Sequence, residues 1–146
     1  MWQSALNYLQ SLRTYRDLGP DTKIRRRINL QLNGRSSLSL EEWSKLFVSE
    51  TEQPPAESLL AFIYEKLPAY SGLKVSQLRP SDRLIEDLQL PLVCWFDWPT
   101  QLCIDFYETF QVDISEEFDE SMLETIGELV FFLNERIISC DPTTSS

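Results

Sequence analysis

Residues 78–133 read LRPSDRLIEDLQLPLVCWFDWPTQLCIDFYETFQVDISEEFDESMLETIGELVFFL, and this stretch decides the fold. Its centre predicts a helix over residues 100–110, because apolar side chains recur there at three- and four-residue steps. These side chains are Leu102, Cys103, Phe106, Tyr107 and Phe110. Pro99 falls near the first turn of this helix, where a missing amide donor costs little.

The end of the same stretch predicts another helix. Thr125 and Glu128 have the spacing of a capping box, in which the two side chains accept backbone amides at the start of a helix. Phe131 and Phe132 face at least partly away from the apolar face that follows, which consists of Ile126, Leu129, Val130, Leu133 and Ile137. Residues 139–146 are polar, and we expect a disordered tail.

Upstream of residue 78, an apolar stripe predicts a helix over residues 56–67, closed by Pro68. The stripe consists of Leu59, Leu60, Ile63 and Leu67. Residues 69–81 have the composition of a long loop, which Leu73, Val75 and Leu78 are expected to anchor. Residues 82–88 are expected to form one irregular turn.

The N-terminal part predicts three more helices. The first covers residues 2–16 and ends before Gly19, with an apolar face of Trp2, Ala5, Leu6, Leu9 and Leu12. The second begins after Asp21, carries Ile24, Ile28 and Leu32 at four-residue spacing, and stops at Asn33 and Gly34. A capping box of Ser39 and Glu42 opens the third, over residues 40–48, which is expected to bury Leu40, Trp43 and Phe47.

The segment SETEQPP, residues 49–55, contains two prolines and no apolar residue, so it predicts a connection. We place a domain boundary there, between a basic helical extension of residues 1–50 and a helical domain of residues 56–138. No useful strand-like alternation competes with the helices. The sequence therefore predicts an all-α fold.

Composition limits the function classes. The 146 residues are 42% hydrophobic, enough for one compact domain, and no apolar run approaches the ~18 residues of a membrane span. Without a secretion signal, a cytoplasmic location is the default expectation. The chain has three cysteines, no Cys-x-x-Cys pair and no histidine, so neither a zinc site nor a histidine-based catalytic group is expected. We therefore expect that the chain is not an enzyme and binds no cofactor.

Charge is divided unevenly between the two parts. Residues 1–48 carry eight Lys/Arg and four Asp/Glu, whereas residues 49–146 carry five and nineteen, so net charges of +4 and −14 sum to −10. The basic part is either a solvated extension or a segment that docks on an acidic surface. Its run Arg25, Arg26 and Arg27 raises a nucleic-acid hypothesis, but the negative surplus and the lack of a stacking aromatic in that run argue against one.

The C-terminal part, residues 56–138, resembles an acyl carrier protein. The resemblance lies in the helix over residues 56–67, the loop ending SDRLIEDLQL, the helix ending DFYETFQVDI, a short acidic turn and a last helix opened by TIGEL. It implies a four-helix bundle. A closer likeness is to serine-lacking, carrier-like bacterial domains of uncharacterised function, which share the Asp-Leu start and a Phe-x-Val-Asp-x-Ser ending, here Phe110 to Ser115.

The chain departs from a working carrier at the functional point. In such a carrier an Asp-Ser-Leu motif soon follows the Asp-Leu pair that is Asp87 and Leu88 here, and its serine receives 4'-phosphopantetheine. This chain has LPLVCWFDW at residues 90–98 instead, and no serine between Ser81 and Ser115. The resemblance therefore implies a scaffold without the usual attachment point and supplies no activity.

Three groups of residues are candidates for binding a partner protein. The aromatic group either fills the core or anchors a partner, and the acidic group is either a solvated face or a surface for a basic protein. Cys94 and Cys103 are interpreted as packed thiols rather than a redox pair. The candidates are Arg25, Arg26, Arg27, Trp95, Phe96, Asp97, Trp98, Glu116, Glu117, Asp119 and Glu120, with Asp113 beside the acidic group.

The resulting hypothesis is a non-catalytic, carrier-like protein-interaction module that acts as an adaptor or regulator. The alternative is an atypical carrier modified at another hydroxyl, for which Thr100 is the candidate near the helix start. The partners expected are proteins, with no nucleic acid and no integral membrane span. No feature of the sequence distinguishes a monomer from an oligomer.

Overall fold

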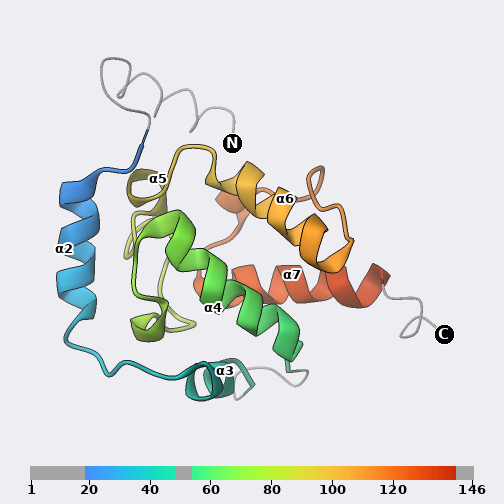
Figure 1. Cartoon of the computed structure of the whole chain (residues 1–146), viewed down its shortest axis with the longest axis horizontal. Helices are drawn as coiled ribbons and strands as arrows, with labels where there is room; N and C mark the ends of the chain where they lie inside the picture. The colour runs from blue at the N-terminus through green and yellow to red at the C-terminus, as the bar shows by residue number, and fades with distance from the viewer. Residues whose placement is uncertain (1–18, 49–53, 141–146) are drawn as a thin grey trace.

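The computed structural model describes residues 19–48 and 54–140, and shows an all-α fold (Figure 1). Within those ranges there are α-helices, two short 3-10 helices and no strand, apart from an isolated bridge between Arg83 and Thr125. The predicted all-α class is therefore confirmed. The predicted helix over residues 2–16, most of the 49–55 connection and residues 141–146 of the predicted tail lie outside the described residues.

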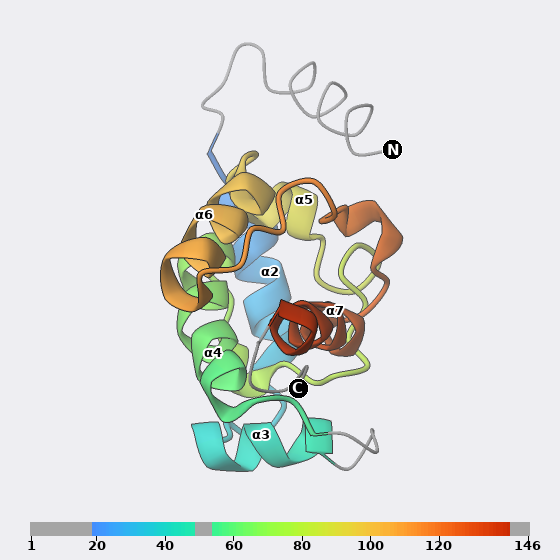
Figure 2. The ribbon, with the colours of Figure 1, turned by 90° about the vertical axis from the view of Figure 1, so that its right-hand side faces the viewer.

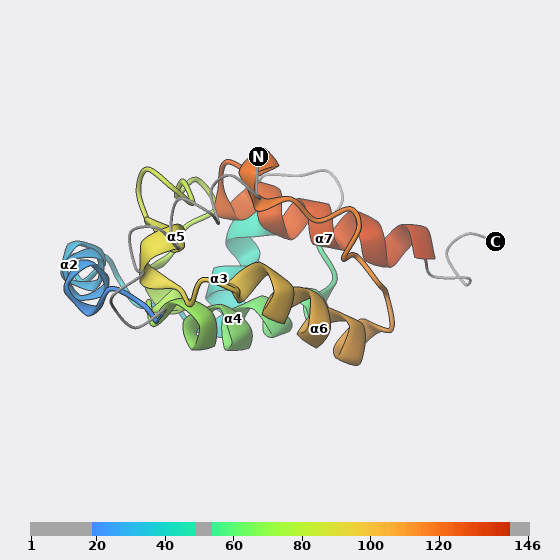
Figure 3. The ribbon, with the colours of Figure 1, turned by 90° about the horizontal axis from the view of Figure 1, so that it is seen from above.

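Six α-helices follow one another in the described part of the chain. They are α2 (Thr22–Leu32), α3 (Leu40–Val48), α4 (Glu57–Ser71), α5 (Leu90–Val93), α6 (Trp98–Phe110) and α7 (Ile126–Cys140). The 3-10 helices are η1 (Val75–Gln77) and η2 (Glu120–Met122). Seen from above, α4 and α6 lie side by side, α7 runs along one side of them, and α2 lies at one end (Figure 3).

Aromatic rings join the three long helices. Phe62 of α4 packs edge-on against Phe106 and Phe110 of α6, with ring centroids 6.0 and 5.4 Å apart. Phe118, which follows α6 in the chain, packs against Trp98 at the start of α6 and against Phe132 of α7. Such ring pairs add to the free energy gained by burying apolar area, so α4, α6 and α7 form the centre of the core.

The same core extends to α2 and α3, which lie behind and below the long helices in the view of Figure 2. Trp43 of α3 is fully buried against Tyr64 of α4, and its indole nitrogen donates to the carbonyl of Leu78 at 3.1 Å. Ile28 and Leu32 of α2 belong to the same buried cluster. Residues on both sides of the predicted boundary at 49–55 therefore share one hydrophobic cluster.

Helices α2, α3 and α7 begin where the sequence predicts, and one of the two predicted capping boxes is complete. Asp21 accepts the amides of Lys23 and Ile24 at the start of α2. At α3, the Glu42 amide donates to the Ser39 hydroxyl at 3.2 Å while the Ser39 amide donates to the Glu42 carboxylate at 3.0 Å, so the predicted capping box is confirmed. At α7, the Glu128 amide donates to Thr125 as predicted, but the Glu128 carboxylate accepts the amide of Glu124, one residue before the expected partner.

Pro68 does not close α4, so that prediction is wrong. The helix continues to Ser71, because Leu67, Tyr70 and Ser71 are buried and their packing outweighs the amide lost at Pro68. It ends instead at Gly72, whose φ of 69° is in the left-handed region that favours glycine, and whose amide donates to the Pro68 carbonyl at 2.7 Å.

Two smaller predictions are also wrong, and one short helix was not predicted. Leu40 is 37% exposed rather than buried, because it lies in the first turn of α3, one turn before Trp43. The short helix α5 lies within residues 90–98, for which the sequence predicted no element. Helix α7 runs to Cys140, past the expected start of the disordered tail at residue 139. The loop anchors Leu73, Val75 and Leu78 are buried as predicted.

Candidate interaction surface

The aromatic candidates separate into core and surface residues. Trp98 is 4% exposed and packs against Phe118, so it belongs to the core. Trp95, three residues earlier, is 49% exposed. One side of its indole is supported by Gly19, where a Cβ atom would come within 3.0 Å of the ring. Phe96 is half-buried and Asp97 is exposed, so Trp98 fills the core as one interpretation predicts, while Trp95 lies at the surface, where its role as an anchor stays a prediction.

A polar cavity of about 520 Å³ lies beside Trp95. Tyr70 of α4 donates a hydrogen bond to Asp105 of α6 at 2.5 Å, and Gln101 donates to the other oxygen of that carboxylate at 3.0 Å. Burial and the Asp105 carboxylate both raise the pKa of Tyr70, so the phenol stays protonated as a donor. The network fixes Asp105 at the wall of the cavity that Trp95 also lines.

An apolar groove with an acidic rim runs along the exposed side of α6. Ile104 is 46% and Tyr107 51% exposed, although both belong to the helix that also buries Leu102 and Phe106. We call this cavity of about 660 Å³ the α6 groove, and its residues are Pro99, Thr100, Cys103, Ile104, Tyr107, Glu108, Asp113, Ser115, Phe118 and Glu120. Its floor is mainly apolar, and Glu108, Asp113 and Glu120 supply the carboxylates.

The acidic candidates have different environments. Glu116 is exposed, and Glu117 forms an ion pair with Arg136 of α7. Asp119 caps η2 by accepting the amide of Ser121 at 3.0 Å and its hydroxyl at 2.6 Å. Burial raises the pKa of Glu120 to about 7, with a further contribution from the Asp119 charge. Of these four, Glu120 is the one that lines the α6 groove.

The three arginines do not form one exposed patch. Arg25 is half-buried and donates to the Val93 carbonyl at 2.7 Å, which ties α2 to α5. Its Nε atom is buried, without a hydrogen-bond partner among the described residues, and packs against Gly72. Arg26 and Arg27 are exposed on α2. Neither lines the α6 groove, so the structure does not join the basic and acidic candidates into one site.

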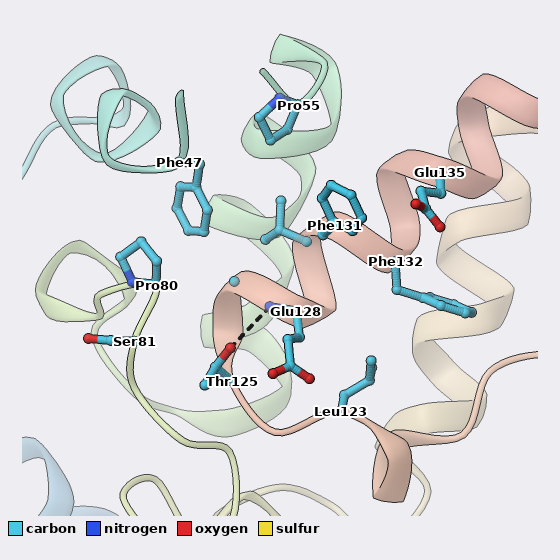
Figure 4. A pocket seen from close by; sticks show the side chains of 12 residues that line it. Phe47, Pro55, Pro80, Ser81, Leu123, Thr125, Glu128, Phe131, Phe132 and Glu135 are labelled. Carbon is cyan, nitrogen blue, oxygen red and sulfur yellow. Dashed lines mark hydrogen bonds between the residues drawn. The ribbon is translucent and has the colours of Figure 1, made fainter. Parts of the chain in front are cut away.

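A second apolar groove lies against α7 (Figure 4). We call this cavity of about 590 Å³ the α7 groove, and the residues that define it are Phe47, Pro55, Pro80, Leu123, Glu128, Val130, Phe131, Phe132 and Glu135. Sequence reasoning placed Phe131 and Phe132 partly off the buried face of this helix but assigned them no role. Phe131 is 44% exposed, and two adjacent phenylalanines beside an apolar stripe were the available signal.

The cysteines are poor nucleophiles at neutral pH. Burial raises the pKa of the Cys94 thiol, and burial together with Asp113 and Glu120 raises that of Cys103 to about 11. Both thiols are free, as interpreted from the sequence. Among the described residues, no cluster of three or more His, Cys, Asp or Glu side chains is placed to bind a metal ion.

The α6 groove lies wholly in the most acidic part of the chain, and the α7 groove lies partly in it. Residues 84–135 contain thirteen Asp/Glu and no Lys/Arg, so a carboxylate within this stretch has no cation of the same stretch beside it. Of the helices that the structure describes, none has the length and apolar character to cross a membrane. No family model matches the chain, and neither the curated proteins nor the solved structures give a significant match.

Proposed function

We propose that the chain is a non-catalytic, carrier-like protein-interaction module, an adaptor or regulator, that binds a partner protein through the α6 groove. The observation that carries this proposal is the pair of exposed apolar residues Ile104 and Tyr107 beside the carboxylates of Glu108 and Asp113. Protein interfaces combine an apolar centre with a polar rim, and this groove has both parts. The partner side is a basic surface with apolar anchors.

The described helices support the carrier-like part of the proposal by their order. A long α4 is followed by a long loop, then by α6, the short η2 and α7, which is the order implied by the resemblance to carriers. Where a carrier places its modified serine, this chain has α5 and the indole of Trp95. An indole that is half exposed and supported from one side is a suitable anchor for an interface, because little conformational entropy is lost when it is covered.

The second candidate function is an atypical carrier modified at Thr100. The observation that favours it is position: Thr100 is exposed in the first turn of α6 and lines the apolar α6 groove, which offers space for an acyl chain. In this reaction the hydroxyl attacks the pyrophosphate of coenzyme A, 4'-phosphopantetheine is transferred, and adenosine 3',5'-bisphosphate leaves.

Comparative capture from the native host tests the interaction proposal. A specific partner of the wild-type chain is expected to be lost with the Ile104→Ala, Tyr107→Ala double variant and retained with Met122→Ala, a matched control because Met122 is 76% exposed and lies outside this groove. The complex should also weaken as salt is raised. Equal capture by all three proteins at every salt concentration would reject the α6 groove.

Intact mass separates the two candidates. After incubation with a phosphopantetheinyl transferase and coenzyme A, an unchanged mass is expected. A mass gain equal to the prosthetic group that is absent in Thr100→Val would favour the atypical carrier over the interaction module.

A third experiment tests whether the basic helix α2 takes part in partner binding. Substitution of Arg26 and Arg27 by alanine leaves the structural Arg25 contact intact, and capture of the partner should then become less sensitive to salt.

A further inference from the structure

The α7 groove has a floor that the fold itself fixes. Phe47, Pro55, Pro80 and Val130 come from four separate segments, and all four are buried. The loop that carries Pro80 is held to α7, because the Gly127 amide donates to the Pro80 carbonyl at 2.9 Å. A side chain at Gly127 would come within 3.2 Å of that oxygen, so glycine permits the close approach. The groove is thus present before any partner binds.

Above this floor, Phe131 projects into the groove with 44% of its surface exposed (Figure 4). Its neighbour Phe132 is already engaged, since it packs against Phe118 and lies 5.3 Å from the guanidinium carbon of Arg136. The apolar surface of Phe131 therefore remains available after the core is complete. An exposed aromatic side chain beside a preformed groove is the arrangement found at the energetic centre of many interfaces.

Two carboxylates flank this aromatic. Glu128 and Glu135 are exposed, line the groove, and lie seven residues apart on α7, which is about 10 Å or two helical turns. The nearest cation in sequence, Arg136, pairs with Glu117 and lies over the ring of Phe132. Its second terminal nitrogen also lies 3.9 Å from the Glu135 carboxylate, a long contact that leaves the Glu135 side chain 52% exposed. The groove therefore combines an apolar centre with negative charge on both sides of it.

From this geometry we propose that the α7 groove binds a basic amphipathic helix of a partner protein, as a second surface separate from the α6 groove. Apolar side chains at positions i, i+3 or i+4 and i+7 of such a helix cover Phe131 and the floor. Lysine or arginine residues seven positions apart have the same two-turn repeat as Glu128 and Glu135, so both pairs form together. A second copy of this chain is a poor occupant, because each copy carries a net charge of −10.

A synthetic helix tests the proposal with the full chain. The probe is a peptide of about 18 residues, long enough for marginal helicity, with leucines on one face and lysines seven apart beside them. Its binding is measured by titration calorimetry. We expect saturable binding of the peptide. The affinity should fall about tenfold in Phe131→Ala and, at low salt, several-fold in the Glu128→Gln, Glu135→Gln double variant. A matched peptide with glutamate in place of lysine should not bind.

The controls separate this inference from the proposed function. Glu108→Gln and the Ile104→Ala, Tyr107→Ala variant alter the α6 groove alone, and both should bind the probe like the wild type. Binding that is lost in these variants but kept in Phe131→Ala would place the peptide in the α6 groove and overturn the inference. Equal binding by every variant, or by the glutamate peptide, would also overturn it. So would a dimer in sedimentation that Phe131→Ala dissociates, since the occupant would then be a second copy.

Discussion

At the scale of single residues, Glu120 lies where a partly buried carboxylate meets other acidic groups. Asp119 precedes it in the chain, and Glu108 and Asp113 line the same groove. Water is partly excluded from Glu120, so the charged form loses hydration and the nearest negative charge opposes ionisation. Its pKa of about 7, against an ordinary 4.5, means that much of this carboxyl group is protonated near neutral pH.

This pKa gives stability a pH dependence of predictable sign. Between pH 4.5 and about 7 the folded chain holds a proton on Glu120 that the unfolded chain has released, so this residue makes the free energy of unfolding fall as pH rises. Glu120→Gln should therefore match the wild type near pH 4.5 and be more stable at pH 8. Urea unfolding at the two pH values measures the difference. The exposed Glu116→Gln is the control, and an identical pH profile for both variants would contradict the assignment.

Trp95 and Trp98 show what sequence can predict about such residues. Both were expected to act as core or as anchor, and their spacing alone gave no way to choose between them. The choice depends on the register of α5 and α6, which places Trp98 at the start of α6, facing Phe118, and leaves Trp95 in the connection beside Gly19. Ile104 and Tyr107 were harder to identify as surface residues, because their helical spacing also fits burial.

At the scale of the elements, one glycine, Gly72, both ends α4 and leaves room for the Arg25 side chain of α2. Gly72 has a φ of 69°, and a Cβ atom there would lie 2.3 Å from the Nε atom of Arg25. Arg25 in turn donates to the carbonyl of Val93, so the position of this guanidinium links α2, α4 and α5. A methyl group at residue 72 must displace it.

Gly72→Ala should therefore be destabilising by roughly 1–3 kcal/mol, the sum of a strained left-handed backbone and a displaced side chain. Gly34→Ala is the matched control, since the only contact there within 4 Å is the Gln31 carbonyl at 4.0 Å. Denaturant unfolding compares the two variants. Adding Arg25→Ala should make the Gly72→Ala substitution less costly, because the clash is gone. Equal stability of both glycine variants would contradict the proposed contact.

The sequence predicted the presence of the helices better than the residues where they end or the segments they pack against. The cap of α3 depends on residues three positions apart, so local spacing identified it, and the start of α2 after Asp21 was also predicted from local sequence. Pro68 was misjudged because the packing that carries α4 past it comes from distant residues: Tyr70 is held by Asp105, 35 positions away. The four-residue α5 is too short to give a periodic signal, and the grooves arise only from the packing of several segments.

At the scale of the whole molecule, the basic and acidic parts of the chain do not have separate hydrophobic cores. The predicted basic extension includes α2 and α3, yet their buried residues belong to the cluster that α4, α6 and α7 share. Arg35, beyond the end of α2, donates two hydrogen bonds to the buried Asp82, at 2.7 and 2.9 Å. Polar and apolar contacts therefore connect the basic part to the acidic part.

This continuity predicts that the described chain unfolds as one cooperative unit. Trp43→Phe removes the indole donor to Leu78 and part of a fully buried ring, so it should lower the free energy of unfolding by roughly 1–3 kcal/mol. The whole transition should shift, with fluorescence and far-ultraviolet dichroism still coincident. Leu30 is 67% exposed on α2, so Leu30→Ala should leave the free energy of unfolding unchanged. Two separate transitions, of which Trp43→Phe moves only the first, would instead favour a boundary at residues 49–55.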